Sequence, residues 1–205
     1  MAYGQFKTYE EVALKFEIKL IECAFVEKQE IIIAPAIFNF IKKNMWLRRN
    51  YVSENAICEM MIAPILGMVS YHHDLPLWSQ VRFDISAEEG LIGVPGFLVA
   101  PASPVGTVFV NPVICVAEVK KENFNEGWAQ VLAEMIAAQR VNGDDQRELF
   151  GIVTTGSIWQ FGKLMQKALT IDIVTYSALE NLSKLFNIIN WLYHTAKLNL
   201  NLHHQ

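Results

Sequence analysis

The sequence predicts a mixed α/β domain, and three observations lead to this class. An amphipathic helical pattern comes first, followed by short apolar runs that Gly and Pro separate, and a long helical pattern closes the chain. Apolar residues make up 52% of the 205 residues and charged residues 19%, which is typical of a chain with a buried core. The length fits one domain over residues 1–205, without repeats or a clear linker.

Three helices are predicted before the first strand. Thr8 with Glu11 three residues later has the capping-box pattern, which opens a helix that we expect to reach about residue 20. A second helix is predicted over residues 37–46, and a third begins near residue 53. Pro64 should kink or interrupt the third helix, because an interior proline removes a backbone hydrogen bond.

The middle of the chain predicts strands around one helix. Six strands are expected, at Val81–Ser86, Ile92–Ala100, Val113–Lys120, Phe150–Thr155, Ile158–Leu164 and Thr170–Tyr176. The helix between the third and fourth strands carries an apolar stripe and ends at Gly143, and Gln130 and Glu134 lie together on another of its faces. A last helix over about residues 178–198 has an apolar stripe that packs either on the sheet or against a second subunit.

Charge and cysteine content limit the class of protein. The formal net charge is −4, so any nucleic-acid contact requires a local basic patch. The three cysteines form no CxxC pair, which favours reduced thiols and a cytoplasmic location. The sequence shows neither a signal peptide nor an apolar run long enough to span a membrane, so no membrane partner is expected.

The third predicted strand ends in an acid and a base. Glu118 and Lys120 are two residues apart, so in a strand they point to the same side, and Cys115, Ala117 and Val119 point to the other. A carboxylate and an ammonium group at the end of a buried strand are costly to desolvate without a partner or a function. The triplet therefore indicates either a structural ion pair or a functional site.

Four motifs in order resemble the PD-(D/E)xK nuclease superfamily, which has the restriction-endonuclease-like fold. They are the helix C-E-M-M-I-A-P-I-L at residues 58–66, the strand L-I-G-V-P-G-F-L-V at 91–99, E-V-K-K at 118–121 and the helix start G-W-A-Q at 127–130. The resemblance spans about residues 59–161. It implies a mixed β-sheet flanked by helices as a core over about residues 53–176, with additional helices at both ends.

The resemblance also implies roles for individual residues. Glu118 matches the metal-binding acid and Lys120 the catalytic lysine, whereas Glu59 matches a supporting glutamate and Gln130 a polar residue of the following helix. The central aspartate of the family falls on Gly96, which is the main departure from the pattern. The implied activity is hydrolysis of DNA or RNA with Mg²⁺, which prefers oxygen ligands.

Each of these assignments has a structural alternative. Asp84 is a candidate second metal ligand with Glu118, but pairing with Arg82 or contact with solvent near a strand end explains it more simply. Glu59 fits an exposed stripe between core positions as well as a ligand. For Gln130, a hydrogen bond to a strand backbone is the structural alternative.

One basic cluster is a candidate nucleic-acid surface. Lys42, Lys43, Arg48 and Arg49 surround aromatic residues, and Lys121 follows the strand-end triplet. The alternative is an ordinary solvated helix face.

Three functional hypotheses follow from these patterns. The first is a Mg²⁺-dependent nuclease, and the second is a nuclease-fold protein that binds or assembles without chemistry or cofactor. The third is a homo-oligomeric interaction protein, such as a dimer, that uses its last helix.

Overall fold

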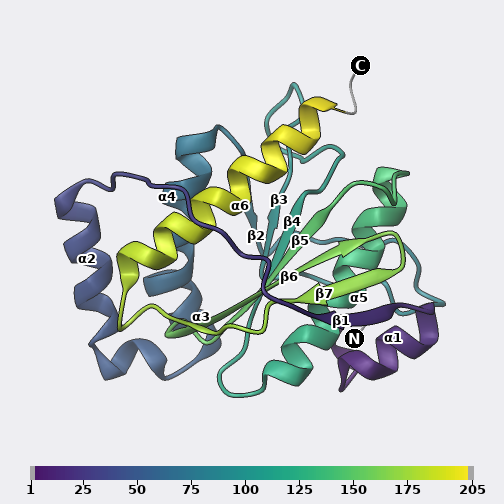
Figure 1. The fold of residues 1–205 in the computed structure, drawn as a ribbon, viewed down its shortest axis with the longest axis horizontal. Helices are drawn as coiled ribbons and strands as arrows, with labels where there is room; N and C mark the ends of the chain where they lie inside the picture. The colour runs from purple at the N-terminus through teal and green to yellow at the C-terminus, as the bar shows by residue number, and fades with distance from the viewer. Residues whose placement is uncertain (1–2, 203–205) are drawn as a thin grey trace.

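A computed structural model, in which residues 3–202 are described, has a mixed eight-stranded sheet between two layers of helices (Figure 1). The α/β class is thereby confirmed. The strands are β1 (Lys19–Glu22), β2 (Leu77–Ser79), β3 (Phe97–Val99), β4 (Cys115–Val119), β5 (Leu149–Thr154), β6 (Ile158–Met165), β7 (Ala168–Ile171) and β8 (Tyr176–Ser177). The α-helices are α1 (Tyr9–Phe16), α2 (Pro35–Met45), α3 (Glu54–Ile57), α4 (Ala63–His73), α5 (Phe124–Asn142) and α6 (Leu182–Leu202).

The strand order is β1-β7-β6-β5-β4-β3-β2, and β8 pairs with β6 outside this path. Strands β2, β3 and β4 form an antiparallel meander, after which α5 crosses over so that β5 pairs parallel to β4. Strands β5, β6 and β7 continue antiparallel, and β1 adds to the far edge parallel to β7. The crossover places α5 directly behind the end of β4.

The two faces of the sheet pack against different helices. On β4, Cys115, Ala117 and Val119 belong to the core formed with α4 and α6, whereas Val116 belongs to the core formed with α5 and α1. This alternation is the one predicted for the strand, and it directs Glu118 toward α5.

The apolar stripe of α6 lies inside the chain. Leu185, Phe186, Ile189 and Leu192 are buried in the core that the helix shares with α4 and the sheet. Of the two alternatives for this stripe, the structure therefore shows packing on the sheet. The homo-oligomer stays a prediction, but the apolar stripe of α6 no longer supports it.

Several predicted boundaries are wrong for identifiable reasons. Residues 81–86 form a loop with a single β-bridge at Ser86, and the strand that precedes β3 is instead β2. The first helix ends at Phe16 because Glu17 adopts the left-handed conformation (φ 58°), and the residues after it form β1. The strand predicted over 92–100 is only β3, and the one predicted over 170–176 divides into the end of β7 and the start of β8.

Local capping signals are confirmed. Thr8 Oγ1 accepts a hydrogen bond from Glu11 N at 3.3 Å, and Gly143 ends α5 with φ 65°. The proline prediction is also confirmed, because a π-helical turn, η3 (Cys58–Ile62), separates α3 from α4 and Pro64 lies in the first turn of α4.

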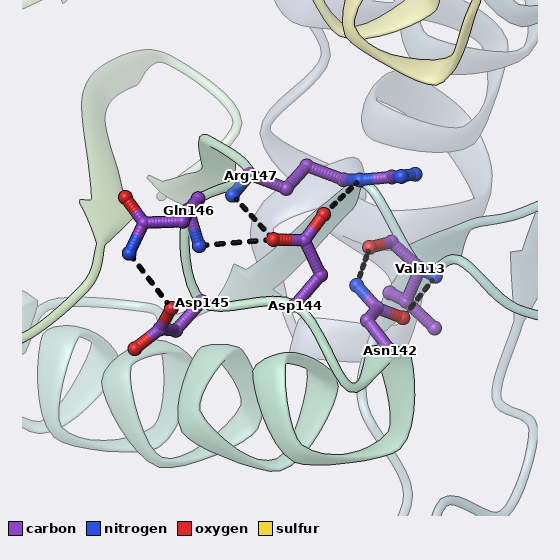
Figure 2. Close-up of polar contacts among 6 residues, drawn as sticks. All are labelled: Val113, Asn142, Asp144, Asp145, Gln146 and Arg147. Atoms are coloured by element: carbon purple, nitrogen blue, oxygen red, sulfur yellow. Dashed lines mark hydrogen bonds and ion pairs between the residues drawn. The ribbon is translucent and has the colours of Figure 1, made fainter. Parts of the chain in front are cut away.

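A polar network fixes the chain as it leaves α5 (Figure 2). The Asn142 side chain donates to Val113 O at 2.7 Å and accepts from Val113 N at 2.8 Å, which joins the end of α5 to the segment before β4. Asp144 accepts hydrogen bonds from the backbone N–H groups of Gln146 and Arg147 and from Arg147 Nε. The Asn142 contacts tie the C-terminal end of α5 to the segment before β4, and the Asp144 contacts order the loop that follows the helix.

No helix within residues 3–202 combines the length and the apolar character that a bilayer span requires.

Candidate active site at the end of strand β4

Glu118 is the centre of a polar cluster between β4 and α5. Its side chain is partly buried, and Oε1 accepts a hydrogen bond from Gly96 N at 3.0 Å. Its Oε2 accepts a weaker bond from Val119 N at 3.3 Å. Gly96 precedes β3, so the neighbouring strand orients the Glu118 carboxylate through its backbone.

A second carboxyl group, Glu134 of α5, meets Glu118 in the interior. Glu134 is only 1% exposed, and a hydrogen bond joins the two side chains. Burial raises the pKa of Glu134 well above its usual range, and the adjacent Glu118 charge raises it further. Because two carboxylates cannot donate to each other, the hydrogen bond requires a proton on one of them. Burial also raises the pKa of Glu118, against the effects of its hydrogen bonds and of Lys120.

Gln130 lies one helical turn before Glu134 and therefore on the same face of α5. Gln130 Oε1 and Glu134 Oε2 are both buried, and neither accepts a hydrogen bond from the residues that the structure describes. The N-terminal 3-10 turn, η1 (Tyr3–Gln5), covers this face: a Cβ on Gly4 would lie 3.0 Å from Gln130 Nε2. Unpaired buried oxygens are costly, so two of them on one helix face require an explanation.

Lys120 lies just beyond the end of β4 and is partly buried. Its charge lowers the pKa of both Glu118 and Glu134, which places it near the pair. No ion pair found among residues 3–202 involves Lys120. Its stem passes close to the start of α5, because a Cβ on Gly127 would lie 3.2 Å from Lys120 Cγ.

Among the other predicted residues, Glu59 is exposed on the η3 turn. The glutamate that contacts the strand end is Glu54, whose Oε1 accepts from Lys121 N at 3.4 Å. The Cys58 thiol connects the two regions: burial raises its pKa to about 11, and Glu118, Glu54 and Glu59 raise it in that order. Glu59 therefore lies near Cys58, no contact of Glu59 with Glu118 is found in the described part of the chain, and its supporting role stays a prediction.

Asp84 is engaged away from Glu118. Its Oδ2 accepts from Arg82 Nε at 2.5 Å and its Oδ1 from Gly93 N at 2.9 Å, so the pairing alternative is observed. The group on which its charge acts is the buried Tyr3 phenol, whose pKa is raised mainly by burial and then by Glu134 and Asp84. No contact between Asp84 and Glu118 is found within residues 3–202. The structure therefore does not support a role of Asp84 as a metal ligand.

The basic candidates are all exposed. Lys42 and Lys43 lie on α2, Arg48 and Arg49 on the 3-10 turn η2 (Arg48–Tyr51), and Lys121 beside Lys120. The contact between Glu54 and Lys121 connects the segment after η2 to the end of β4.

Glu134 is the site residue that sequence reasoning did not assign. Its helical spacing from Gln130 was a usable signal, but only the crossover geometry brings it onto Glu118. Within residues 3–202, no three His, Cys, Asp or Glu side chains gather as a metal site. The cluster provides two carboxyl groups, one amide oxygen and one ammonium group. No protein-family model matches the chain, and no curated protein sequence matches it either.

Proposed function

We propose that this chain is a nuclease of the PD-(D/E)xK type that hydrolyses phosphodiester bonds of nucleic acid with Mg²⁺. One observation carries the proposal: Glu118 and Lys120, chosen from the sequence, lie in one cluster with Glu134 of α5, and Gln130 lies one helical turn before Glu134 on the same face of that helix. The antiparallel β2-β3-β4 meander and the α5 crossover to β5 support the restriction-endonuclease-like core.

The residues present fit a hard cation, although not in the pattern of the family. Gly96 provides no carboxylate, and its N–H donates to Glu118. Glu118 and Glu134 would hold Mg²⁺ with Gln130 Oε1, because Mg²⁺ commonly takes one or two carboxylates and completes its shell with phosphate and water. Gln130 Oε1 and Glu134 Oε2 are buried without a hydrogen-bond donor in the described part of the chain, and this supports their assignment as ligands of a cation. The cation would supply Lewis-acid activation of the phosphate and of a water molecule.

The side chains of the chain itself have separate tasks in this proposal. Glu118 fixes the anionic end of the site, because two backbone N–H groups orient its carboxylate. Lys120 provides a positive charge without an ion-pair partner in the described part of the chain, which stabilises negative charge developing on the phosphate. The η1 turn over Gln130 keeps the inner side of the cluster away from water.

A second candidate function is a nuclease-fold module that binds nucleic acid without cleaving it. Gly96 favours it, because the expected aspartate is absent and a backbone N–H occupies one oxygen of Glu118. This candidate shares the basic surface with the first and differs only in chemistry.

A gel assay on labelled single- and double-stranded DNA and RNA with millimolar Mg²⁺ or Mn²⁺ separates the two candidates. The nuclease predicts cleavage that a chelator stops and that Lys120→Ala lowers by at least about 100-fold. Lys28→Ala, which removes an exposed lysine of the N-terminal segment, is the matched control and should cleave normally. Absence of cleavage on every substrate, or equal activity in wild type and Lys120→Ala, would refute the nuclease and leave the binding module.

A further inference from the structure

The stretch from Ile31 to Ser53 differs in charge from the rest of the chain. It contains four basic residues, Lys42, Lys43, Arg48 and Arg49, and no acidic residue, whereas the whole chain has a net charge of −4. None of the four takes part in an ion pair found within residues 3–202. A positive surface of this kind attracts a polyanion even on an acidic protein.

Aromatic rings are exposed among these charges. Trp46 is 67% exposed and Phe40 is 54% exposed, which is unusual for large apolar side chains beside a complete core. On α2 the spacing places Phe40 next to Lys43, and Lys42 next to Trp46 at the helix end. Cations that alternate with exposed rings are the arrangement that binds single strands, because phosphates meet the cations and unpaired bases stack on the rings.

A concave region adjoins Trp46. A cavity of about 240 Å³ lies between α2 and the residues that lead into α6, and its lining includes Lys42, Trp46, Glu180 and Asn181. An aromatic wall with amide and charged groups nearby suits a splayed base, which duplex nucleic acid does not offer.

The surface leads toward the candidate site. The η2 turn is followed by α3, and Glu54 at the start of α3 contacts Lys121 beside Lys120. Figure 1 shows α2 at one edge of the molecule and α3 between it and the strand ends. A strand bound along α2 and η2 would therefore approach Lys120 and Glu118.

The opposite face of α2 argues against a membrane as the partner. Ile41 and Met45 are buried in the core, so the helix has no continuous apolar face free to insert into lipid.

We propose that residues Phe40 to Arg49 form a docking surface for single-stranded nucleic acid, in which Trp46 and Phe40 stack on bases and Lys42, Lys43, Arg48 and Arg49 contact phosphates. The proposal deepens the function above by naming its substrate class, yet binding here does not require cleavage.

Fluorescence anisotropy with a labelled oligonucleotide, measured in chelator, tests binding apart from chemistry. The single strand should bind at least about tenfold more tightly than the duplex of the same sequence, because only unpaired bases can stack. Four phosphate contacts predict a slope of log K against log salt of about −3. Trp46→Ala should weaken binding about 5- to 150-fold, whereas Trp46→Phe, which keeps a ring, should bind nearly as wild type.

Charge variants complete the test. Lys42→Ala with Lys43→Ala should reduce the slope by about 1.4, whereas the control pair Lys19→Ala with Lys28→Ala, which removes two exposed lysines elsewhere, should leave the slope unchanged. Three results would overturn the proposal. The first is an equal change of the salt slope in the two double variants, and the second is an unchanged affinity of Trp46→Ala when this variant melts as wild type. The third is an equal affinity of the wild type for single strand and duplex. Binding to vesicles of phosphatidylserine and phosphatidylcholine without binding to the oligonucleotide would also overturn it. Binding without any cleavage would uphold this surface and refute only the nuclease.

Discussion

The close packing of α5 on the sheet leads to a quantitative prediction at Gly127. A Cβ at this position would lie 2.4 Å from Val153 Cγ1, which is buried in β5, and 3.2 Å from Lys120 Cγ. Replacing glycine by alanine within a helix stabilises it by about 1 kcal/mol. Inserting a methyl group into a filled core costs about 1–3 kcal/mol, so Gly127→Ala should range from neutral to about 2 kcal/mol less stable than wild type.

Gly67 in α4 is the matched control for this substitution. It lies about as far into its helix as Gly127, and a Cβ there would meet nothing within 4 Å. Gly67→Ala should therefore stabilise the chain by up to about 1 kcal/mol. Because the gain in helix propensity is common to both variants, the difference between their free energies of unfolding isolates the packing cost, about 1–3 kcal/mol.

Urea unfolding followed by circular dichroism measures this difference, provided that the slope m stays constant across the three proteins. In thermal melts, Gly127→Ala should melt roughly 2–12 °C below Gly67→Ala. Equal unfolding free energies for the two variants would show that Val153 yields easily and that the approach of α5 does not depend on glycine. The position of Gln130 and Glu134 opposite Glu118 would then need another cause.

Three further predictions test other parts of the structure. Asp172 is 4% exposed and accepts hydrogen bonds from the backbone N–H groups of Phe25, Val26 and Val174. Asp172→Ala should therefore lower the free energy of unfolding in urea by at least about 2 kcal/mol and speed proteolysis of the segment before α2. An unchanged rate of proteolysis would contradict this anchoring role. Burial lowers the pKa of His73, against its hydrogen bond to Asn190 and with the charges of His72, Lys197 and His194. The folded state therefore favours neutral His73. The contribution of this residue to stability is complete above the ordinary pKa of 6.5 and is lost as the pH falls through the lower pKa of the folded state. Thermal melts between pH 7.5 and about 5 should show this loss of stability, and His73→Gln should make the loss smaller. Gly96→Asp should be less stable than wild type in chelator, because its Cβ would lie 2.9 Å from Ala117 O. The same Cβ would lie 3.6 Å from Glu118 Oε2, so the variant should gain a Mg²⁺-dependent rise in melting temperature. A melting temperature that does not change with Mg²⁺ would count against a metal position beside Glu118.

Local signals in the sequence were sufficient for most helices and for the central strands. Thr8, Pro64 and Gly143 act on backbone groups close to them in the chain, so the helix ends that they set can be predicted from a few neighbouring residues. Strand β1 was missed because its pairing partner, β7, is about 150 residues away in the chain. The segment around Asp84 was misread as a strand because alternating polar and apolar residues also suit a loop held by side-chain hydrogen bonds.

The candidate site could be predicted only in part. Glu118, Lys120 and Gln130 were chosen from their order in the sequence; the structure places Lys120 near Glu118 and Gln130 one helical turn before Glu134, and the roles of all three stay predictions. Glu54 was overlooked in favour of Glu59, because its contact is with the backbone N–H of Lys121, 67 residues away in the chain, which no local pattern indicates. The partnership of Glu118 and Glu134 depends on the crossover, which no local pattern encodes.

The cost of the acid pair is itself an argument about function. A buried glutamate beside a second carboxyl group opposes folding, and an apolar or amide side chain on the same helix face would remove that penalty. Glu134→Gln should therefore be at least as stable as wild type in chelator, because an amide has nearly the same shape and no charge to desolvate. If the pair holds a cation, wild type should gain melting temperature with millimolar Mg²⁺ or Mn²⁺, and Glu134→Gln should lose this gain. A cation response that is equal in both proteins would place the metal elsewhere, whereas a loss of stability in Glu134→Gln without metal would assign the pair to the architecture of the core.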